Sequence, residues 1–212
     1  MTTILVFGDS IACGFWDSEG GWVARLRKYL DKRNLSEDGS YYVVYNLGIS
    51  GDTTRELLKR FDAEVKARVN EIESPKDLII IFAIGINDAG MLNSKDMVPP
   101  LEFKRSLEKL LDKARSLTSN VVFIGSTPVD ETKTHPVAWS EGFHYDNASI
   151  ARDNKIIEAV CAEDRVMFLG LARPFGPGYS SLLQDGVHPN SDGHKLIYQT
   201  VKSFLVKKKL IK

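Results

Sequence analysis

One serine, one histidine and one aspartate have types and spacing that suit nucleophilic catalysis. Asp185 and His188 lie three residues apart in the run Asp-Gly-Val-His-Pro. A carboxylate at this distance can hold one imidazole nitrogen while the other faces outward as a base. Such a base is what a serine nucleophile needs, and Ser10 in Gly8-Asp9-Ser10 is the candidate. Alone these signals are weak, because Gly, Asp and Ser are ordinary residues of turns and helix caps.

Five short β-rich runs alternate with longer segments of helical periodicity, which indicates a parallel sheet covered by helices. The runs are Ile4–Phe7, Tyr41–Asn46, Leu78–Ala83, Val121–Gly125 and Val166–Leu169. One helix is expected after the capping-box pair Thr53 and Glu56, and a last helix near Ser191. We therefore predict a single α/β domain over residues 1–212. It should be a flavodoxin-like three-layer α/β/α sandwich with a five-stranded parallel sheet of order 2-1-3-4-5.

This strand order brings three polar turns side by side, at the sheet edge where open α/β folds bind their ligands. The first strand leads to Ser10, the second to the run Asn-Leu-Gly-Ile-Ser-Gly at 46–51, and the third to Asn87. The Asp-x-x-His run follows the fifth strand and directly precedes the last helix. Joint placement at one end of one sheet favours a single catalytic pocket over a set of unrelated turns.

These blocks, in this order, resemble the SGNH hydrolases, also called GDSL esterases and lipases. The residues that give the family its name match Ser10, Gly48, Asn87 and His188, and the resemblance covers essentially the whole chain. One departure is Ile11, where the alternative name expects leucine. That position is an apolar support of the turn, so the chemistry is unaffected.

The resemblance implies an esterase or lipase that works through an acyl-enzyme. Ser10 would attack an ester carbonyl, His188 would take and return the proton, and Asp185 would fix the imidazole tautomer. The backbone N–H groups of Ser10 and Gly48 and the side-chain amide of Asn87 would form the oxyanion hole. No metal or other cofactor is expected, and the favoured substrate is a small, water-soluble carboxylic ester.

The segment 129–145 lacks periodicity and is long for a connection inside one domain. Because it follows the fourth strand, we expect it on the active-site side, where Trp139 and Phe143 are candidates for the walls of a substrate pocket. Simple packing on the surface, or contact with another copy of the chain, is the alternative. A second long connection, 170–184, is expected to carry the Asp-x-x-His run back to the nucleophile.

Four further residues near these blocks receive non-catalytic interpretations. Asp9 and Asp88 are expected to accept hydrogen bonds that hold their turns. Cys13 is expected to be a small buried residue, and His194 to face solvent or cap the last helix.

Composition restricts the partners. The 212 residues include 28 Lys and Arg and 28 Asp and Glu, so the formal charge is zero and no global field draws the chain to nucleic acid or anionic lipid. Two cysteines are too few for a disulfide framework, and no apolar run approaches the roughly 20 residues of a membrane span. We expect a cytoplasmic protein that binds a small ester, without nucleic-acid binding or stable membrane insertion.

Several alternatives stay open. An acyl-enzyme can pass its acyl group to an alcohol, so an acyltransferase fits the same residues, as does a deacetylase acting on a carbohydrate or a thioester. A catalytically silent ligand-binding module is a further possibility. A flavin site is disfavoured, because Ser10 is followed by Ile-Ala-Cys, which is poor material for a phosphate loop.

Overall fold

The computed structural model describes residues 1–36, 41–69 and 74–212, and at its centre is a five-stranded sheet. The strands are β1 (Thr2–Gly8), β2 (Tyr42–Gly48), β3 (Leu78–Ala83), β6 (Val121–Ile124) and β8 (Met167–Leu169). Their order is β2-β1-β3-β6-β8, and all neighbours pair in parallel. Since β6 and β8 are the fourth and fifth strands of this sheet, the predicted order 2-1-3-4-5 is confirmed.

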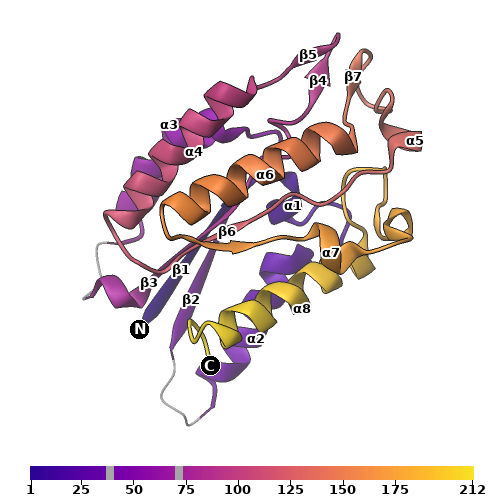
Figure 1. Ribbon diagram of the computed structural model, residues 1–212. Coiled ribbons are helices and arrows are strands. Elements are labelled where there is room, and N and C mark those ends of the chain that lie inside the picture. Colours follow the sequence, from indigo (N-terminus) through magenta and orange to yellow (C-terminus); the bar gives the residue numbers. More distant parts are fainter. Residues whose placement is uncertain (37–40, 70–73) are drawn as a thin grey trace.

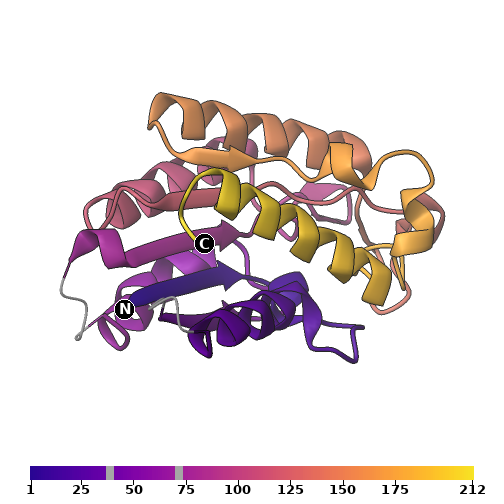
Figure 2. The same ribbon diagram turned by 90° about the horizontal axis from the view of Figure 1, so that it is seen from below.

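The strands send alternate side chains into two apolar layers, as a sheet buried on both faces must. Phe7 and Phe82 pack toward one set of helices, and Val6 and Ile81 toward the other. The first set is α3 (Thr54–Lys66), α4 (Pro100–Arg115) and α6 (Asn147–Glu163); the second is α2 (Gly21–Asn34) and α8 (Ser191–Lys207). Figures 1 and 2 show the sheet between these two layers, which confirms the α/β/α sandwich. No helix in the described part of the chain combines the length and apolar character that a membrane crossing requires.

Helix starts follow from local chemistry. Thr53 caps α3, and Glu56 reaches back to the Thr53 N–H at 3.2 Å, which completes the predicted capping box. At the start of α8, the Asn190 side chain accepts the N–H groups of the second and third helical residues. These caps fix where each helix leaves the turns at the carboxyl end of the sheet.

Short elements gather beyond the carboxyl ends of the strands (Figure 1). They include a second, antiparallel sheet of order β5-β4-β7 that the sequence analysis did not predict. Its strands are β4 (Met91–Leu92), β5 (Lys95–Asp96) and β7 (Phe143–His144). The other short elements are α1 (Ser10–Cys13), α5 (Glu131–Thr134), α7 (Ala172–Phe175), η1 (Pro75–Asp77) and η2 (Tyr179–Leu182). Of these, η1 lies apart, just before β3.

Candidate active site

Ser10 is positioned by the end of β1. It is the first residue of α1, and Asp9 caps that short helix by accepting the Ile11 N–H at 2.9 Å, as predicted for Asp9. A Cβ at Gly8 would lie 2.6 Å from the carbonyl oxygen of Ala83, so glycine allows β1 and β3 to approach closely just before the turn. Burial raises the pKa of Asp9 to about 6, against the effect of its hydrogen bond from Ile11.

The Asp-x-x-His turn places its imidazole against Ser10. Ser10 Oγ lies 2.9 Å from His188 Nε2, and His188 Nδ1 lies 2.7 Å from Asp185 Oδ2. Asp185 Oδ1 accepts the backbone N–H groups of Val187 and His188 at 3.0 and 2.8 Å. Burial acts to raise the pKa of Asp185, but the hydrogen bonds from His188 and Val187 outweigh it and hold the pKa below its usual range. An ionised Asp185 accepts a hydrogen bond from the Nδ1–H of His188, which leaves Nε2 to accept a hydrogen bond from the serine hydroxyl.

Asn87 follows β3, and two neighbours fix the orientation of its amide. Asn87 Nδ2 donates to the carbonyl oxygen of Asp52 at 2.9 Å, and Asn87 Oδ1 accepts from the Tyr145 hydroxyl at 2.9 Å. With the amide held at both ends, the second N–H of Nδ2 is left for a ligand. The sequence analysis missed Tyr145, since a lone tyrosine in a segment without periodicity carries no signal of its own.

Gly48 does not face the site, so the prediction that it supplies an oxyanion donor is wrong. Its N–H donates to Asn46 Oδ1 at 3.0 Å, in an exposed position on the edge strand β2. A Cβ at Gly48 would lie 2.7 Å from the Cys13 nitrogen and 2.8 Å from the Asp9 carbonyl oxygen, so glycine is needed for close packing of β2 against α1. Cys13 is half-buried and its thiol donates to the Gly48 carbonyl at 3.0 Å, which also corrects its assignment as a buried apolar residue.

Gly51 lies in the cavity wall in place of Gly48. Its φ of +80° is in the left-handed region that favours glycine, and no atom lies within 4 Å of where its Cβ would be. Among the residues that the structure describes, none accepts a hydrogen bond from the Gly51 N–H. This turn therefore presents a free donor on the same side as Ser10 and Asn87.

A cavity of about 290 Å³ opens beside Ser10 and His188. Trp139 and Phe143 lie in its wall, on the active-site side where the sequence analysis expected the segment 129–145. The ring centre of Trp139 is 5.7 Å from that of His188. The lining of the cavity thus combines polar groups with aromatic rings, which suits a substrate with a polar reacting centre and an apolar substituent.

Comparison with known proteins identifies the family. The model of the GDSL-like lipase/acylhydrolase family matches residues 6–196. The chain belongs to this family. This GDSL-like hydrolase is 27% identical to esterase TesA from Pseudomonas aeruginosa over 191 residues, which cover 88% of this chain and 79% of TesA.

Two further relatives are similar to this GDSL-like hydrolase along most of its length. An isoamyl acetate-hydrolyzing esterase 1 homolog from Bos taurus is 26% identical over 220 residues, covering 97% of this chain and 82% of the relative. The crystal structure of the lipase/acylhydrolase from Enterococcus faecalis is 27% identical, with a TM-score of 0.74 and coverage of 98% of this chain and 97% of that chain. The predicted resemblance is confirmed, and the protein is a carboxylic ester hydrolase.

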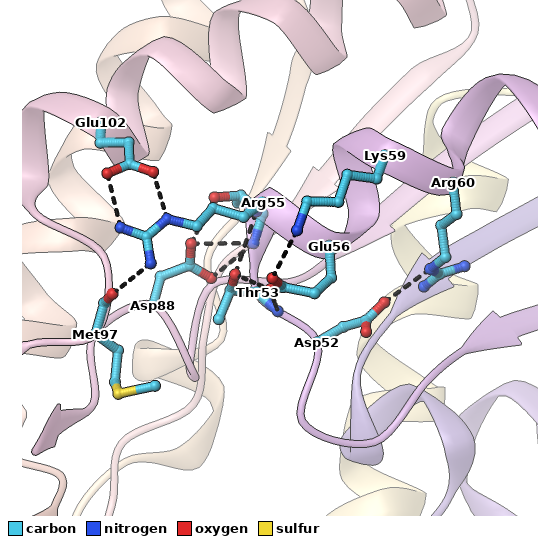
Figure 3. Close-up of polar contacts among 10 residues, drawn as sticks. Asp52, Thr53, Arg55, Glu56, Lys59, Arg60, Asp88, Met97 and Glu102 are labelled. Carbon is cyan, nitrogen blue, oxygen red and sulfur yellow. Dashed lines mark hydrogen bonds and ion pairs between the residues drawn. The ribbon is translucent and has the colours of Figure 1, made fainter.

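In this GDSL-like hydrolase the turn that carries Gly51 is anchored on both sides (Figure 3). Asp52 pairs with Arg60 at 2.7 Å. Asp88 accepts hydrogen bonds from the N–H of Thr54, at 3.0 Å, and from its hydroxyl. This carboxylate therefore holds the first turn of α3, which corrects the prediction that it holds its own turn.

Arg55, in the first turn of α3, makes further contacts that hold the start of this helix. Its guanidinium donates to the Met97 carbonyl at 2.8 Å and pairs with the Glu102 carboxylate of α4 (Figure 3). Burial raises the pKa of Asp88 to about 7, and the nearby Asp153 carboxylate acts in the same direction. The region behind the cavity therefore combines exposed ion pairs with a buried carboxyl group.

His194 is fully buried, which corrects the prediction that it faces solvent or caps α8. Its Nδ1 accepts from the Trp22 N–H at 3.3 Å, and its Nε2 lies 2.9 Å from the Phe15 carbonyl oxygen. Burial lowers the pKa of His194, and a neutral ring that accepts at Nδ1 donates at Nε2. His194 therefore ties the loop after α1 to the start of α8.

Proposed function

We propose that the chain, as one domain over residues 1–212, hydrolyses small carboxylic esters through an acyl-enzyme on Ser10. The observation that carries the proposal is the hydrogen-bonded line from Ser10 through His188 to Asp185, which borders an open cavity. His188 takes the Ser10 proton as Oγ attacks the ester carbonyl, and it then protonates the leaving alcohol. Water, activated by the same imidazole, releases the acid and restores the serine.

Three donors are assigned to the oxyanion. They are the backbone N–H groups of Ser10 and Gly51 and the second N–H of Asn87 Nδ2. The Ser10 N–H belongs to the first residue of α1, where no intrahelical acceptor exists. Because these groups are already oriented before the substrate binds, they stabilise the developing negative charge without reorganisation. Gly51 takes the role that sequence reasoning gave to Gly48.

The cavity favours a short acyl chain. Its volume of about 290 Å³ is at the small end for ligand sites, and Trp139 and Phe143 close its apolar side. The Bos taurus relative is named for isoamyl acetate, a small ester, which supports the same range of substrates. Trp139 is 50% exposed, so the wall of the cavity beside His188 borders solvent and water can reach the acyl-enzyme.

A series of p-nitrophenyl esters from acetate to decanoate tests this function. We expect kcat/KM to be highest for acetate or butyrate and to fall by about tenfold or more for octanoate, because a few misplaced methylene groups change pocket binding by this much. A fluorophosphonate probe should attach once, to Ser10, as read by mass spectrometry of the digested protein. Ser10→Ala is the control for both measurements. Attachment at another residue, or full activity of Ser10→Ala, would contradict the acyl-enzyme.

A further inference from the structure

Trp16 lies beside the carboxylate of Asp185, and its indole N–H donates to Oδ2 at 2.9 Å. The same oxygen lies 2.7 Å from His188 Nδ1. The other oxygen accepts the backbone N–H groups of Val187 and His188. Within residues 1–36, 41–69 and 74–212, four donors thus surround this carboxylate, and of these the indole alone comes from outside the turn that contains it.

The backbone of Trp16 is in a conformation that bulky residues rarely adopt. Its φ is +64°, in the left-handed region, and 58% of the residue is exposed. An exposed aromatic ring gains little free energy from burial, so burial of the ring does not account for this conformation. Backbone outliers of this kind persist where the surrounding structure imposes them, and they cluster at functional sites.

Both chain neighbours of Trp16 are anchored by buried groups. The carbonyl of Phe15 accepts from His194 Nε2 at 2.9 Å. Asp17, which is also buried, receives two hydrogen bonds from the Arg25 guanidinium, each at 3.0 Å. Hydrogen bonds therefore fix the backbone on both sides of Trp16, and they direct its indole toward the turn that contains Asp185.

We propose that Trp16 is a positioning residue for the acid of the catalytic triad, an inference that rests on the function proposed above. By donating to Oδ2, the indole limits rotation of the Asp185 side chain and takes up part of its negative charge. Less of that charge then acts on His188, so Trp16 sets how firmly the imidazole holds the proton of Ser10. Trp16 does this without touching the reacting atoms.

Trp139 provides a matched control for this role. Its ring lies 5.7 Å from that of His188, compared with 6.5 Å for Trp16, and the two tryptophans are similarly exposed. Within the described chain, the indole N–H of Trp139 makes no hydrogen bond to Asp185. Replacement of either residue by phenylalanine keeps an aromatic ring near His188, but only replacement of Trp16 removes a donor to the acid.

Other titratable groups also act on this pair. Asp9 and His194 interact electrostatically with His188, and Tyr145 with Asp185. All three are unchanged in either tryptophan variant, so they contribute equally to both pH profiles.

The test compares Trp16→Phe with Trp139→Phe in kcat and KM measured from about pH 5 to about pH 9 on p-nitrophenyl acetate. For Trp16→Phe we expect kcat to fall by about three- to tenfold with little change in KM. The acidic limb of the kcat/KM profile should move up by about half a pH unit, because more of the Asp185 charge then stabilises the imidazolium. Trp139→Phe changes a substrate contact, so KM shifts while the limb stays in place.

The positioning role of Trp16 would be refuted if the acidic limb of the kcat/KM profile did not move in Trp16→Phe, or if it moved equally in Trp16→Phe and Trp139→Phe. A second variant carries benzothienylalanine at position 16, which keeps the ring shape and replaces the N–H by sulfur. This variant must show the same upward shift of the acidic limb. If Trp16→Phe does not fold, this variant alone tests the role of the indole N–H. Fluorophosphonate labelling of Ser10 is recorded in parallel. Loss of labelling in the wild type refutes the acyl-enzyme, whereas intact labelling with an unmoved limb refutes only the role of Trp16.

Discussion

Ser10 and Asn87 follow the ends of buried strands, whereas Asp185 and His188 lie in a turn that no strand of the main sheet supports. On the sheet side, defined by Ser10 and Asn87, packing of β1 and β3 in the core fixes the backbone. On the turn side, defined by Asp185 and His188, the chain is held by hydrogen bonds, both within the turn and from neighbouring loops, where the Asp130 N–H donates to the Gly186 carbonyl at 2.8 Å. The Gln184 N–H donates to the His188 carbonyl at 2.8 Å. The Asp185 carboxylate both closes this turn and orients the imidazole.

The difference shows where stability and catalysis are separable. A polar side chain at the end of a buried strand can change without loosening the strand. The Asp185 side chain cannot, because the same oxygens that orient His188 also accept two backbone N–H groups. Substitutions on the two sides should therefore differ in how activity and unfolding change together.

The largest expected loss of kcat does not distinguish the two sides, because the reaction needs Ser10 from the sheet side and His188 from the turn side at the same time. We expect Ser10→Ala and His188→Ala each to lower kcat by about 10⁶, with little further loss in the double variant, since the two residues act as one unit. Single-turnover assays on p-nitrophenyl acetate measure all three. Losses that multiply in the double variant would show that the residues work independently.

The next prediction concerns the turn side alone. Asp185→Ala should lower kcat by about 10⁴, since the imidazole loses its fixed tautomer. It should also reduce the free energy of unfolding by about 1–3 kcal/mol, because two buried N–H groups lose their acceptor. Urea unfolding of wild type and variant measures the second effect. An unchanged midpoint would mean that the carboxylate does not hold the turn.

The matched substitution on the sheet side is Asn87→Ala. One missing oxyanion donor should cost about 10²–10³ in kcat. The unfolding free energy should change by less than for Asp185→Ala, because the Asn87 amide is only partly buried and β3 ends before it. Unchanged kcat in folded protein would remove Asn87 from the site. Equal destabilisation in both variants would remove the distinction between the sides.

The sequence predicted the strands of the sheet from local signals. The strand order was chosen as the common order for five βα units, and the convergence of Ser10, Asn87 and the Asp-x-x-His turn followed from that order. Apolar runs mark buried strands, and polar turns follow them. The sequence could not show whether Gly48 or Gly51 provides the backbone N–H for the oxyanion, since this depends on the φ of one turn and on the direction of one N–H. Local signals do not contain such information.

The missed contacts share a physical cause. The hydrogen bond from Trp16 to Asp185 joins residues 169 positions apart, and that from Tyr145 to Asn87 spans 58 positions. Each is made by a loop whose path depends on the finished fold. His194 was misassigned for the same reason, because its partners lie on the loop after α1 and at the start of α2.

Charge gives a further way to sharpen the comparison. On the turn side the pKa of Asp185 is lowered, whereas behind Asn87 burial raises the pKa of Asp88 to about 7. The folded state therefore binds the Asp88 proton more tightly than the unfolded state. The resulting stabilisation is complete below about pH 4 and is lost as the pH rises through about 7.

Asp88→Asn should remove this dependence while keeping an acceptor for Thr54. We expect the wild type to lose about 1–3 kcal/mol more unfolding free energy than Asp88→Asn between about pH 4 and about pH 8. The raised pKa of Asp9 contributes to both proteins, so the difference isolates Asp88. Parallel curves for the two proteins would show that Asp88 is ionised throughout the folded state.

A smaller effect is expected from a contact between the loop that contains Tyr145 and the sheet side. Tyr145, which follows β7, donates its hydroxyl to Asn87 Oδ1 and so leaves the Nδ2 donors pointing toward Asp52 and the cavity. Tyr145→Phe keeps the ring, which packs at 5.0 Å against Phe143, and removes only this hydrogen bond. We expect kcat to fall by up to about tenfold with KM unchanged, because a neutral hydrogen bond contributes up to about 1.5 kcal/mol to holding the amide.

A double variant separates orientation from a direct role of the Tyr145 hydroxyl. Once Asn87→Ala has removed the amide, Tyr145→Phe should cost almost nothing further, because the hydroxyl has no amide left to orient. A full tenfold loss in the Asn87→Ala background would mean that Tyr145 contacts the substrate itself. In that case Tyr145 would act on the substrate directly, in addition to the oxyanion donors of Ser10, Gly51 and Asn87.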